Sequence, residues 1–282
     1  MCPQSNSRGA EALVISLIAV ATVVLQLLVG DVPCDVLRFP LNIILAAAAI
    51  VAMVDGYRRR RSSSFVSFML SPRAMWLSLF MMVALGITLG LQRRPATTSW
   101  PVVVALLYIL LHLGFVILRG WRAGAGARLR FLMLHLGLWL ALFAMVVGAP
   151  DRVQMRAVVE RDKPQSMAYA EDGRPISLGY ALRLAGFEAS YYDNGTPSAF
   201  RADVEVDGRR VSLAVNHPHR LSWSERLYLV SYDREAECRY VVVEVVREPW
   251  QWLTTVGVVM LIVGAVLLFL GGPRGVNAKS VR

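Results

Sequence analysis

Six runs of hydrophobic residues, almost free of charged positions, recur along the chain. A helix needs about 20 residues at 1.5 Å each to cross a hydrocarbon core about 30 Å thick. Five of the runs lack a polar face, which excludes a buried amphipathic helix, and the second is short and contains Asn42. The six predicted transmembrane segments are Ala12–Gly30, Phe39–Val54, Ala74–Leu91, Pro101–Leu118, Phe131–Val147 and Trp252–Leu270.

The first hydrophobic run begins after Glu11 and has neither a basic segment before it nor a clear small-residue cleavage site after it. A secretory signal peptide normally shows both features. We therefore expect this run to be retained as a transmembrane helix.

The segment between the fifth and sixth runs has the alternating pattern of β-strands. Asp207-Gly208 is the residue pair that a two-residue type I′ hairpin prefers, and Asp193-Asn194-Gly195 reads as a turn. The segment is small and shows no nucleophile–base arrangement, so we expect an antiparallel sandwich that binds or scaffolds. Five strands are predicted, at Phe187–Tyr192, Phe200–Val206, Arg210–Val215, Leu227–Tyr232 and Arg239–Val246.

The predicted fold is a membrane helical bundle of six transmembrane helices with an inserted antiparallel β-rich domain. Residues 1–149 form a five-helix region, residues 150–249 the β-rich domain, and residues 250–282 the final helix with its tail.

Charge is distributed unevenly between these regions. Residues 151–248 hold 14 Lys/Arg and 16 Asp/Glu, whereas the rest of the chain holds 16 basic and only 4 acidic residues. The net charge of +10 therefore belongs to the hydrophobic part, where it indicates membrane topology rather than nucleic-acid binding.

The short loops predict the orientation. Thirteen basic residues fall on one side of the predicted membrane, and the other side holds Arg38, Arg93 and Arg94. Because cytoplasmic loops carry the excess of Lys and Arg, both termini are expected in the cytoplasm and residues 150–249 outside it. The thirteen are Arg8, Arg58, Arg59, Arg60, Arg61, Arg73, Arg119, Arg122, Arg128, Arg130, Arg274, Lys279 and Arg282. Trp100, Trp250 and Trp252 fall at the predicted outer interface, as an aromatic belt would.

Three cysteines leave two alternatives. Cys2 is expected in the cytoplasm, whereas Cys34 and Cys238 are expected outside, where a disulfide between them would persist. Of the two alternatives we favour two unpaired thiols, and without a Cys-x-x-Cys pair thioredoxin-like chemistry has no support. Asn194-Gly195-Thr196 matches a glycosylation sequon, but a hairpin turn explains it sufficiently.

Two histidines lie inside predicted transmembrane helices. His112 is seven residues before Arg119, and His135 is five residues after Arg130. At 1.5 Å per residue, they lie roughly 10 and 8 Å from the cytoplasmic ends of adjacent antiparallel helices. Neutral imidazoles at matching depth can ligate a metal or haem iron. The alternative is that each histidine hydrogen-bonds a neighbouring group and only packs.

Both histidines occur in the phrase Leu-His-Leu-Gly, at Leu111–Gly114 and Leu134–Gly137. A glycine two residues from the histidine allows close approach of a flat ligand or of a partner helix. The arginines nearby anchor the cytoplasmic side, and a second use would be to bind carboxylates such as haem propionates. The other two histidines, His217 and His219, lie in the β-rich domain.

From about Phe131 to Gly272 the chain resembles the ResB (CcsB) family of cytochrome c biogenesis proteins. A helix with His-Leu-Gly leads into the outer domain. Gly186–Phe200 is then similar to the family's F-x-x-x-Y-x-x-G-x-P-x-x-F stretch. Val215–Pro218 resembles its V-N-x-P and Leu227–Asp233 its Y-x-x-S-Y. Val246–Pro249 then opens the final helix. The family commonly has three helices before a larger outer domain, so this chain resembles a reduced or divergent branch.

The resemblance implies a subunit that holds haem b and works with a ResC (CcsA)-like partner and apocytochrome c in the bacterial cytoplasmic membrane. The family's haem-ligating histidine, in the helix before the outer domain, matches His135 alone. A role of His112 in ligating haem depends only on its depth in the membrane, and His217 matches a variable position of V-N-x-P. The chain would be non-catalytic or co-catalytic, because thioether formation takes its thiols from the apocytochrome.

Two other classes remain as alternatives. A membrane scaffold or sensor subunit would bind a protein through the β-rich domain, and its histidines would only pack. A transporter would show broken helices and internal repeats, for which Gly86, Gly90 and Pro101 are too scattered.

Overall fold

The computed structural model describes residues 4–59, 63–92, 97–121, 125–194, 196–234 and 238–270. The chain divides into two compact units. The helical unit comprises residues 1–150 and 253–282, and the β unit comprises residues 151–252.

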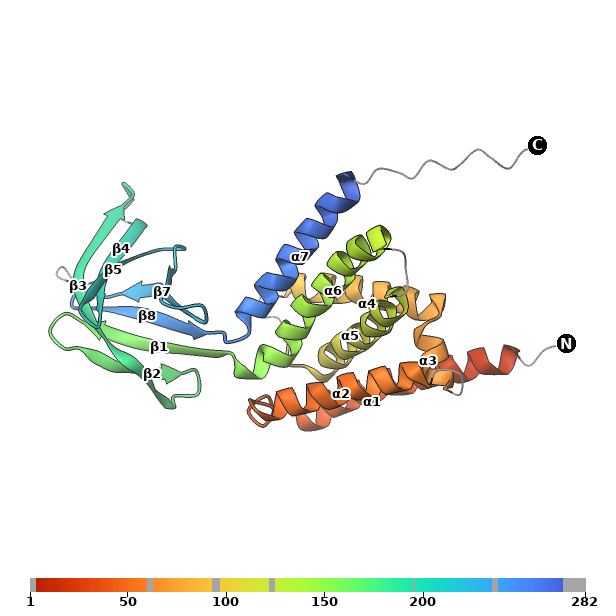
Figure 1. The fold of residues 1–282 in the computed structure, drawn as a ribbon. Helices are drawn as coiled ribbons and strands as arrows, with labels where there is room; N and C mark the ends of the chain where they lie inside the picture. Colours follow the sequence, from red (N-terminus) through yellow and green to blue (C-terminus); the bar gives the residue numbers. More distant parts are fainter. Residues whose placement is uncertain are drawn as a thin grey trace. The chain divides into compact units, whose positions relative to one another are not determined.

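Six of the helices are long and apolar enough to cross a membrane, which confirms the predicted multi-pass bundle within the described residues (Figure 1). A seventh, α3, is a single short helix of six residues that the sequence analysis did not predict, because it follows a polar, serine-rich stretch. The helices are α1 Gln4–Val29, α2 Leu41–Arg58, α3 Ser64–Met69, α4 Pro72–Leu91, α5 Trp100–Gly120, α6 Ala125–Gly148 and α7 Gln251–Leu270.

Local chemistry sets the corner between α3 and α4. The Ser63 hydroxyl accepts a hydrogen bond from the Val66 amide, and the Ser71 hydroxyl accepts one from the Ala74 amide, each 3.4 Å long. Both are N-cap bonds, and Pro72 at the start of α4 has the backbone angle that a first helical turn needs. This corner packs on α5, where Val66, Met69 and Phe115 form a small buried cluster.

Glycines bring α6 and α7 into close contact. A Cβ atom added to Gly257 of α7 would lie 2.6 Å from the Ala141 amide nitrogen of α6. A Cβ atom added to Gly137 of α6 would lie 2.8 Å from the Gly257 carbonyl oxygen. Small residues facing one another let helix backbones approach in this way, and dispersion contacts then hold the pair together in lipid.

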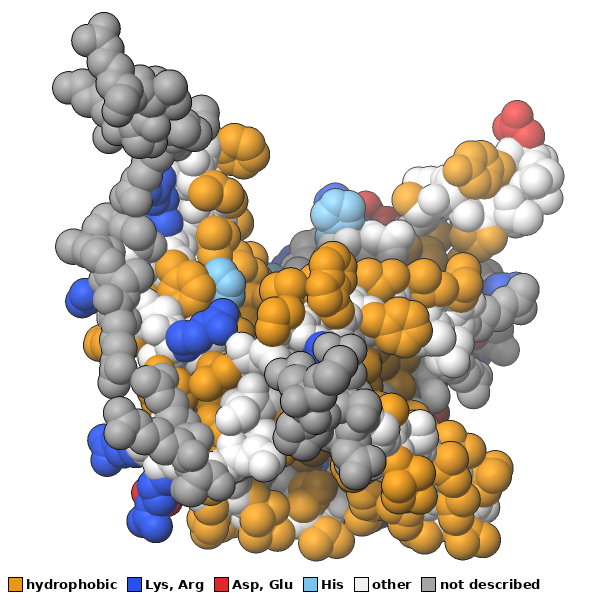
Figure 2. Space-filling model, turned by 90° about the vertical axis from the view of Figure 1, so that its right-hand side faces the viewer, with side chains coloured by type: hydrophobic (Ala, Val, Ile, Leu, Met, Phe, Trp, Pro, Cys, Tyr) orange, Lys and Arg blue, Asp and Glu red, His pale blue; other side chains and the backbone are white. Residues whose placement is uncertain are grey.

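The outer faces of the helical unit are apolar. Leu27 and Leu28 of α1, Phe80 of α4 and Phe269 of α7 are each at least 70% exposed. In one view of the molecule, hydrophobic side chains dominate the described surface of the helices and charged side chains are few (Figure 2). Exposed apolar surface on this scale fits lipid as the surrounding medium.

The β unit is one antiparallel sheet of eight strands in the order β5-β4-β3-β2-β1-β8-β7-β6. The antiparallel prediction is confirmed, and the strands form a single continuous sheet. Strands β1, β2 and β6 were not predicted, and β3 begins 12 residues earlier than expected. The strands are β1 Val153–Glu160, β2 Gln165–Ala170, β3 Pro175–Tyr191, β4 Pro197–Val206, β5 Arg209–Ala214, β6 His219–Arg220, β7 Glu225–Tyr232 and β8 Tyr240–Arg247.

The sheet curls around one hydrophobic core. Leu182 and Leu184 of β3, Leu213 of β5, Leu227 of β7 and Val243 of β8 are all at most 1% exposed and belong to this core. Alternation explains the arrangement, because every second residue of a strand points to the same face.

The predicted hairpin between β4 and β5 is confirmed. Val206 pairs with Arg209, leaving Asp207 and Gly208 as a two-residue turn with φ angles of 46° and 81°. A type I′ turn needs positive φ at both central residues, which explains the Asp-Gly pair. The other predicted turn, at Asp193-Asn194-Gly195, also separates two strands, although Gly195 lies outside the described residues.

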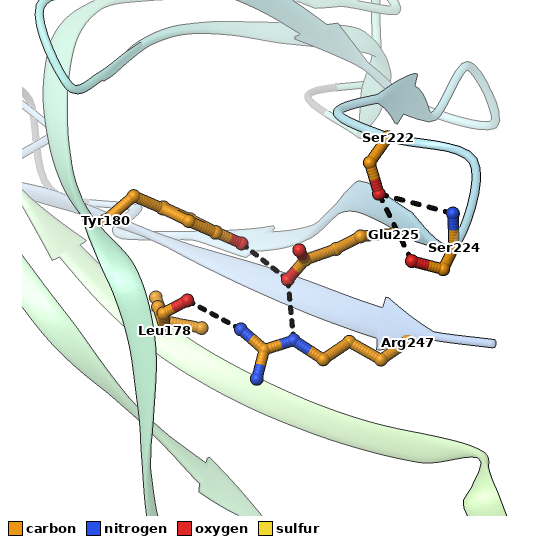
Figure 3. A network of polar contacts seen from close by, with 6 residues as sticks. All are labelled: Leu178, Tyr180, Ser222, Ser224, Glu225 and Arg247. Atoms are coloured by element: carbon orange, nitrogen blue, oxygen red, sulfur yellow. Dashed lines mark hydrogen bonds and ion pairs between the residues drawn. The ribbon is translucent and has the colours of Figure 1, made fainter. Parts of the chain in front are cut away.

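A polar network ties β3 to β7 and β8 (Figure 3). The Tyr180 hydroxyl donates to Glu225 Oε1 over 2.9 Å, and Arg247 Nε donates to the same oxygen over 2.9 Å. Arg247 also donates to the Leu178 carbonyl oxygen at 2.6 Å. Burial, and then the neighbouring Glu225 carboxylate, raise the pKa of Tyr180, so its hydroxyl remains a donor at neutral pH.

Candidate functional site

His135 lies in the first half of α6 and is half-buried. Its Nδ1 atom is 2.9 Å from the Phe131 carbonyl oxygen, one turn earlier in the same helix. Its ring stacks on the Phe131 ring, with centroids 4.0 Å apart and planes 21° apart. The Phe131 ring in turn lies against Gly120 at the end of α5.

The hydrogen bond of His135 fixes its tautomer. A carbonyl oxygen can only accept, so Nδ1 of His135 carries the proton and donates it to Phe131. In the neutral ring Nε2 then holds an unprotonated lone pair, and it has no hydrogen-bond partner among the described residues. An Nδ1–H bonded to a carbonyl with a free Nε2 is the arrangement of metal-bound histidines.

His112 lies in α5 and is almost wholly buried, at 6% exposed. Its Nδ1 atom is 3.0 Å from the carbonyl oxygen of Met69, the last residue of α3. Seven residues further along α5, Arg119 donates to the next carbonyl, that of Leu70, over 3.0 Å. The last carbonyls of a helix have no partner within it, so His112 and Arg119 together satisfy the end of α3.

The two histidines lie on neighbouring antiparallel helices. Gly120 of α5 faces Phe131 of α6, and Trp139 Nε1 of α6 donates to the Leu110 carbonyl of α5 over 3.0 Å. This register places His112 and His135 within about one helical turn of each other in depth. In the part of the chain that the structure describes, no hydrogen bond or ring contact joins the two imidazoles.

The glycines of the two Leu-His-Leu-Gly phrases both serve close packing of the protein. A Cβ atom added to Gly114 would overlap the Met53 side chain of α2. It would also lie 3.6 Å from Trp139 Nε1 of α6. Gly137 lies against the backbone of α7. Of the two explanations for these glycines, the structure therefore supports approach of a neighbouring helix.

Basic side chains lie near the same ends of α5 and α6. Arg128 and Arg130 are half-buried in the first turns of α6, and Arg119 is exposed at the end of α5. Arg130 has no acidic partner among the described residues. Several basic residues used to predict orientation lie outside the described residues: Arg60, Arg61, Arg93, Arg94, Arg122, Arg274, Lys279 and Arg282.

The opposite end of α6 is held by α2 and by the segment just before it. Asn42 Nδ2 donates to the Val147 carbonyl over 3.0 Å, and Arg38 Nε donates to the Pro150 carbonyl over 3.2 Å. These bonds satisfy carbonyls at and just beyond the end of α6, where a cation is also favoured by the helix dipole. Asn42, which made the second helix the weakest prediction, therefore anchors the helix that carries His135.

Comparison with known proteins relates part of the chain to a protein family. A model of the ResB-like family matches residues 122–239, less than half of the chain. We call residues 122–239 the ResB-like segment. No curated protein sequence matches the chain. A solved structure entitled "Cytochrome c Heme Lyase CcmF" is similar at 17% identity and a TM-score of 0.41, covering 89% of this chain and 43% of that one. The chain thus spans less than half the length of that structure.

The ResB-like segment contains His135 and most of the β unit. Its phrases, far apart in sequence, converge on one aromatic cluster. The Tyr232 ring of β7 lies 4.6 Å from the Phe187 ring of β3 and 4.8 Å from the Phe200 ring of β4. Its hydroxyl lies 3.5 Å from that of Tyr191. In the sequence these residues form a pattern similar to that of the family, and the fold shows that they pack together.

His217 of the ResB-like segment lies in the turn between β5 and β6. It is exposed, and its Nδ1 atom is 3.0 Å from the Val215 carbonyl oxygen. It lines an open groove of about 450 Å³ in the β unit, which the sequence analysis did not predict. His217 and His135 belong to different units of the chain.

Cys34 and Cys238 are free thiols. Burial, and then the Asp35 and Asp31 carboxylates, raise the pKa of Cys34. Burial also raises the pKa of Cys238. Both thiols are therefore protonated and weakly nucleophilic at neutral pH. Cys2 lies outside the described residues, and no group of three or more His, Cys, Asp or Glu side chains among the described ones could hold a metal ion.

Proposed function

We propose that this protein is a membrane subunit of a cytochrome c biogenesis complex and that His135 ligates haem b within it. The ResB-like match over residues 122–239 supports the pathway, and a ResC (CcsA)-like membrane protein is the partner we propose. The observation that carries the proposal for haem is the state of His135, whose Nδ1 proton is fixed and whose Nε2 lone pair is free.

The donor set around His135 fits haem. A neutral imidazole in an apolar helix suits iron ligation, and the aromatic ring of Phe131 orients it. Arg130, five residues earlier and without an acidic partner among the described residues, is suited to a propionate. When bound, haem would supply the group that is joined to the thiols of the apocytochrome.

His112 is the weaker candidate for the second axial ligand. Its Nδ1 bond to Met69 joins α5 to α3, and its ring is buried within the protein. His135, by contrast, bonds only within its own helix, so its ring contributes less to holding helices together. We therefore propose that a histidine of the partner supplies the second ligand and that His112 positions α5 against α3.

Absorption spectroscopy tests this function directly. The full chain, co-expressed with a ResC (CcsA)-like protein and purified in detergent, should show a Soret band and the pyridine haemochrome spectrum of haem b. A folded complex without haem under haem-replete growth would leave the scaffold or sensor function, in which the β unit binds a protein and the histidines pack.

We also propose that both termini are cytoplasmic and that residues 150–249 lie outside the bacterial cytoplasmic membrane. In a variant lacking its native cysteines, a cysteine at exposed Arg209 should react with a membrane-impermeant maleimide in intact cells. A cysteine at exposed Arg59 should react only after permeabilisation, because arginine-rich loops stay in the cytoplasm. Labelling of the Arg59 position in intact cells would reverse the orientation.

A further inference from the structure

The groove beside His217 shows where the β unit can hold a protein partner. We infer that it binds an extended polypeptide segment of the apocytochrome, which adds to the free edge of β7. The inference rests on the proposed function for the identity of the client, while the site itself rests on the geometry of the β unit.

The floor of the groove is the face of the sheet opposite the hydrophobic core. Met155 of β1, Val245 of β8 and Leu227 of β7 stand opposite one another and point into the core. The residues next to them in each strand therefore point the other way. Gln154, Glu244 and Tyr228 are such neighbours, and all three line the groove.

The wall of the groove is the turn that follows β5. Ala214, Asn216 and His217 line it, and an isolated bridge joins Ala214 to His217. Asn216 has a φ of 59°, which turns the chain sharply at this point. The Val215 carbonyl accepts the Nδ1 proton of His217, so the unprotonated nitrogen of the neutral ring is Nε2.

The same groove borders an unpaired strand edge. Strand β6 pairs with β7 only at Arg226 and Leu227, and no described strand pairs with Tyr228–Tyr232 on that side. Tyr228, Leu229 and Val230, the residues at which the pairing stops, are also the β7 residues that line the groove. An unpaired edge presents backbone N–H and C=O groups, and another extended backbone is the partner that satisfies them.

The groove lining is suited to an irregular, polar segment. Arg152 supplies a positive charge and Glu244 a negative charge to the groove. Arg152 also pairs with Glu248 at 3.0 Å, and Glu244 pairs with Arg156 at 3.3 Å. Asn216, Gln154 and Tyr228 supply neutral donors and acceptors. An extended client segment can therefore pair its backbone with β7 and place alternate side chains in the groove.

A flexible client fits this edge better than a second copy of the chain. The pairing of β7 with β8 shifts register between Leu229 and Ser231. Such a bulge twists a strand and discourages edge-to-edge pairing between folded sheets. A segment without fixed structure can follow the bulge, because it is not bound to a flat partner sheet.

The test uses the full chain, co-purified with its ResC (CcsA)-like partner in detergent, and a fluorescein-labelled peptide. The peptide carries the Cys-x-x-Cys-His haem-attachment sequence of a c-type cytochrome, with both cysteines replaced by serine. Fluorescence anisotropy should show saturable binding. Methylation of alternate backbone nitrogens on the pairing side should weaken it roughly fivefold or more, since each methyl group removes a donor. Y228A and H217A should weaken it, whereas Y192A, an exposed tyrosine that does not line the groove, should leave it unchanged.

Each outcome decides the inference. Peptide binding that neither N-methylation nor Y228A weakens would overturn the inference. So would the absence of peptide binding together with a loss of self-association in Y228A, because that result would assign the groove to a second copy of the chain. Circular dichroism with thermal melting excludes misfolded variants. Haem content is measured on the same preparations. A normal haem spectrum with no peptide binding would reject this inference alone, and peptide binding without haem would reject the proposed haem function alone.

Discussion

Replacing His135 by alanine should remove haem b from the complex. Loss of a second-shell group commonly costs roughly 10–100-fold in metal affinity, so the loss of an axial ligand itself should cost at least about 100-fold. We expect this loss because Nε2 of His135 carries a lone pair that no described residue uses. No hydrogen bond to another helix depends on the ring, so the substitution should leave the helix packing intact. Haem content per folded complex, from the pyridine haemochrome and the Soret absorbance, measures the effect.

Three comparisons make the His135 experiment specific. Imidazole added to the H135A complex should restore much of the Soret band, because it can occupy the space that the side chain leaves. The H219A variant, which changes a half-buried histidine of the β unit, should keep the haem content of the wild type. Equal haem content in H135A and wild type, at equal folded protein, would contradict the ligand assignment.

The H112A variant separates packing from ligation. Because His112 bonds the last carbonyl of α3, its loss should lower thermal stability by leaving the carbonyl of the buried residue Met69 unsatisfied. We expect added imidazole to leave both haem content and stability of H112A unchanged. Restoration of the Soret band of H112A by imidazole would instead make His112 an axial ligand.

The sequence was most informative where one physical constraint dominates. Six apolar runs gave six membrane helices, because helices satisfy their own backbone in lipid. Asp207-Gly208 specified its hairpin, because few residue pairs accept two positive φ angles. Strand β1 was missed, although Met155, Ala157 and Val159 alternate with polar residues, because the alternation breaks at Val158, an exposed valine.

The sequence was least informative about contacts between distant segments. It placed His112 and His135 at similar depth, but it could not show that Met69 would take the Nδ1 bond of His112. Nor could the sequence show that the turn at Asn216 would lie beside the unpaired edge of β7, since that depends on how the whole sheet curls. Proximity of this kind follows from tertiary packing, to which local propensity contributes little.

Replacing Gly257 by alanine should strongly destabilise the helical unit. The new Cβ atom would lie 2.6 Å from the Ala141 amide nitrogen and 2.7 Å from the Gly137 carbonyl oxygen, and both are backbone atoms that cannot rotate away. Overpacking costs about 1–3 kcal/mol even where side chains can adjust. We expect a loss at the upper end of that range in the free energy of unfolding, measured by SDS titration in mixed micelles.

Gly86 provides the matched control. It also lies within a membrane helix, α4, but an added Cβ atom would have nothing within 4 Å. G86A should therefore be neutral or stabilising by about 0.5–1 kcal/mol, since alanine loses less backbone entropy than glycine in a helix. The two substitutions add the same methyl group, so opposite signs of the change in stability would assign the effect of G257A to the α6–α7 contact.

Because Gly137 lies two residues after His135, G257A should also loosen the helix that holds the ligand and lower haem content. Equal stability of G257A and G86A would show that α7 does not pack on α6 through these glycines.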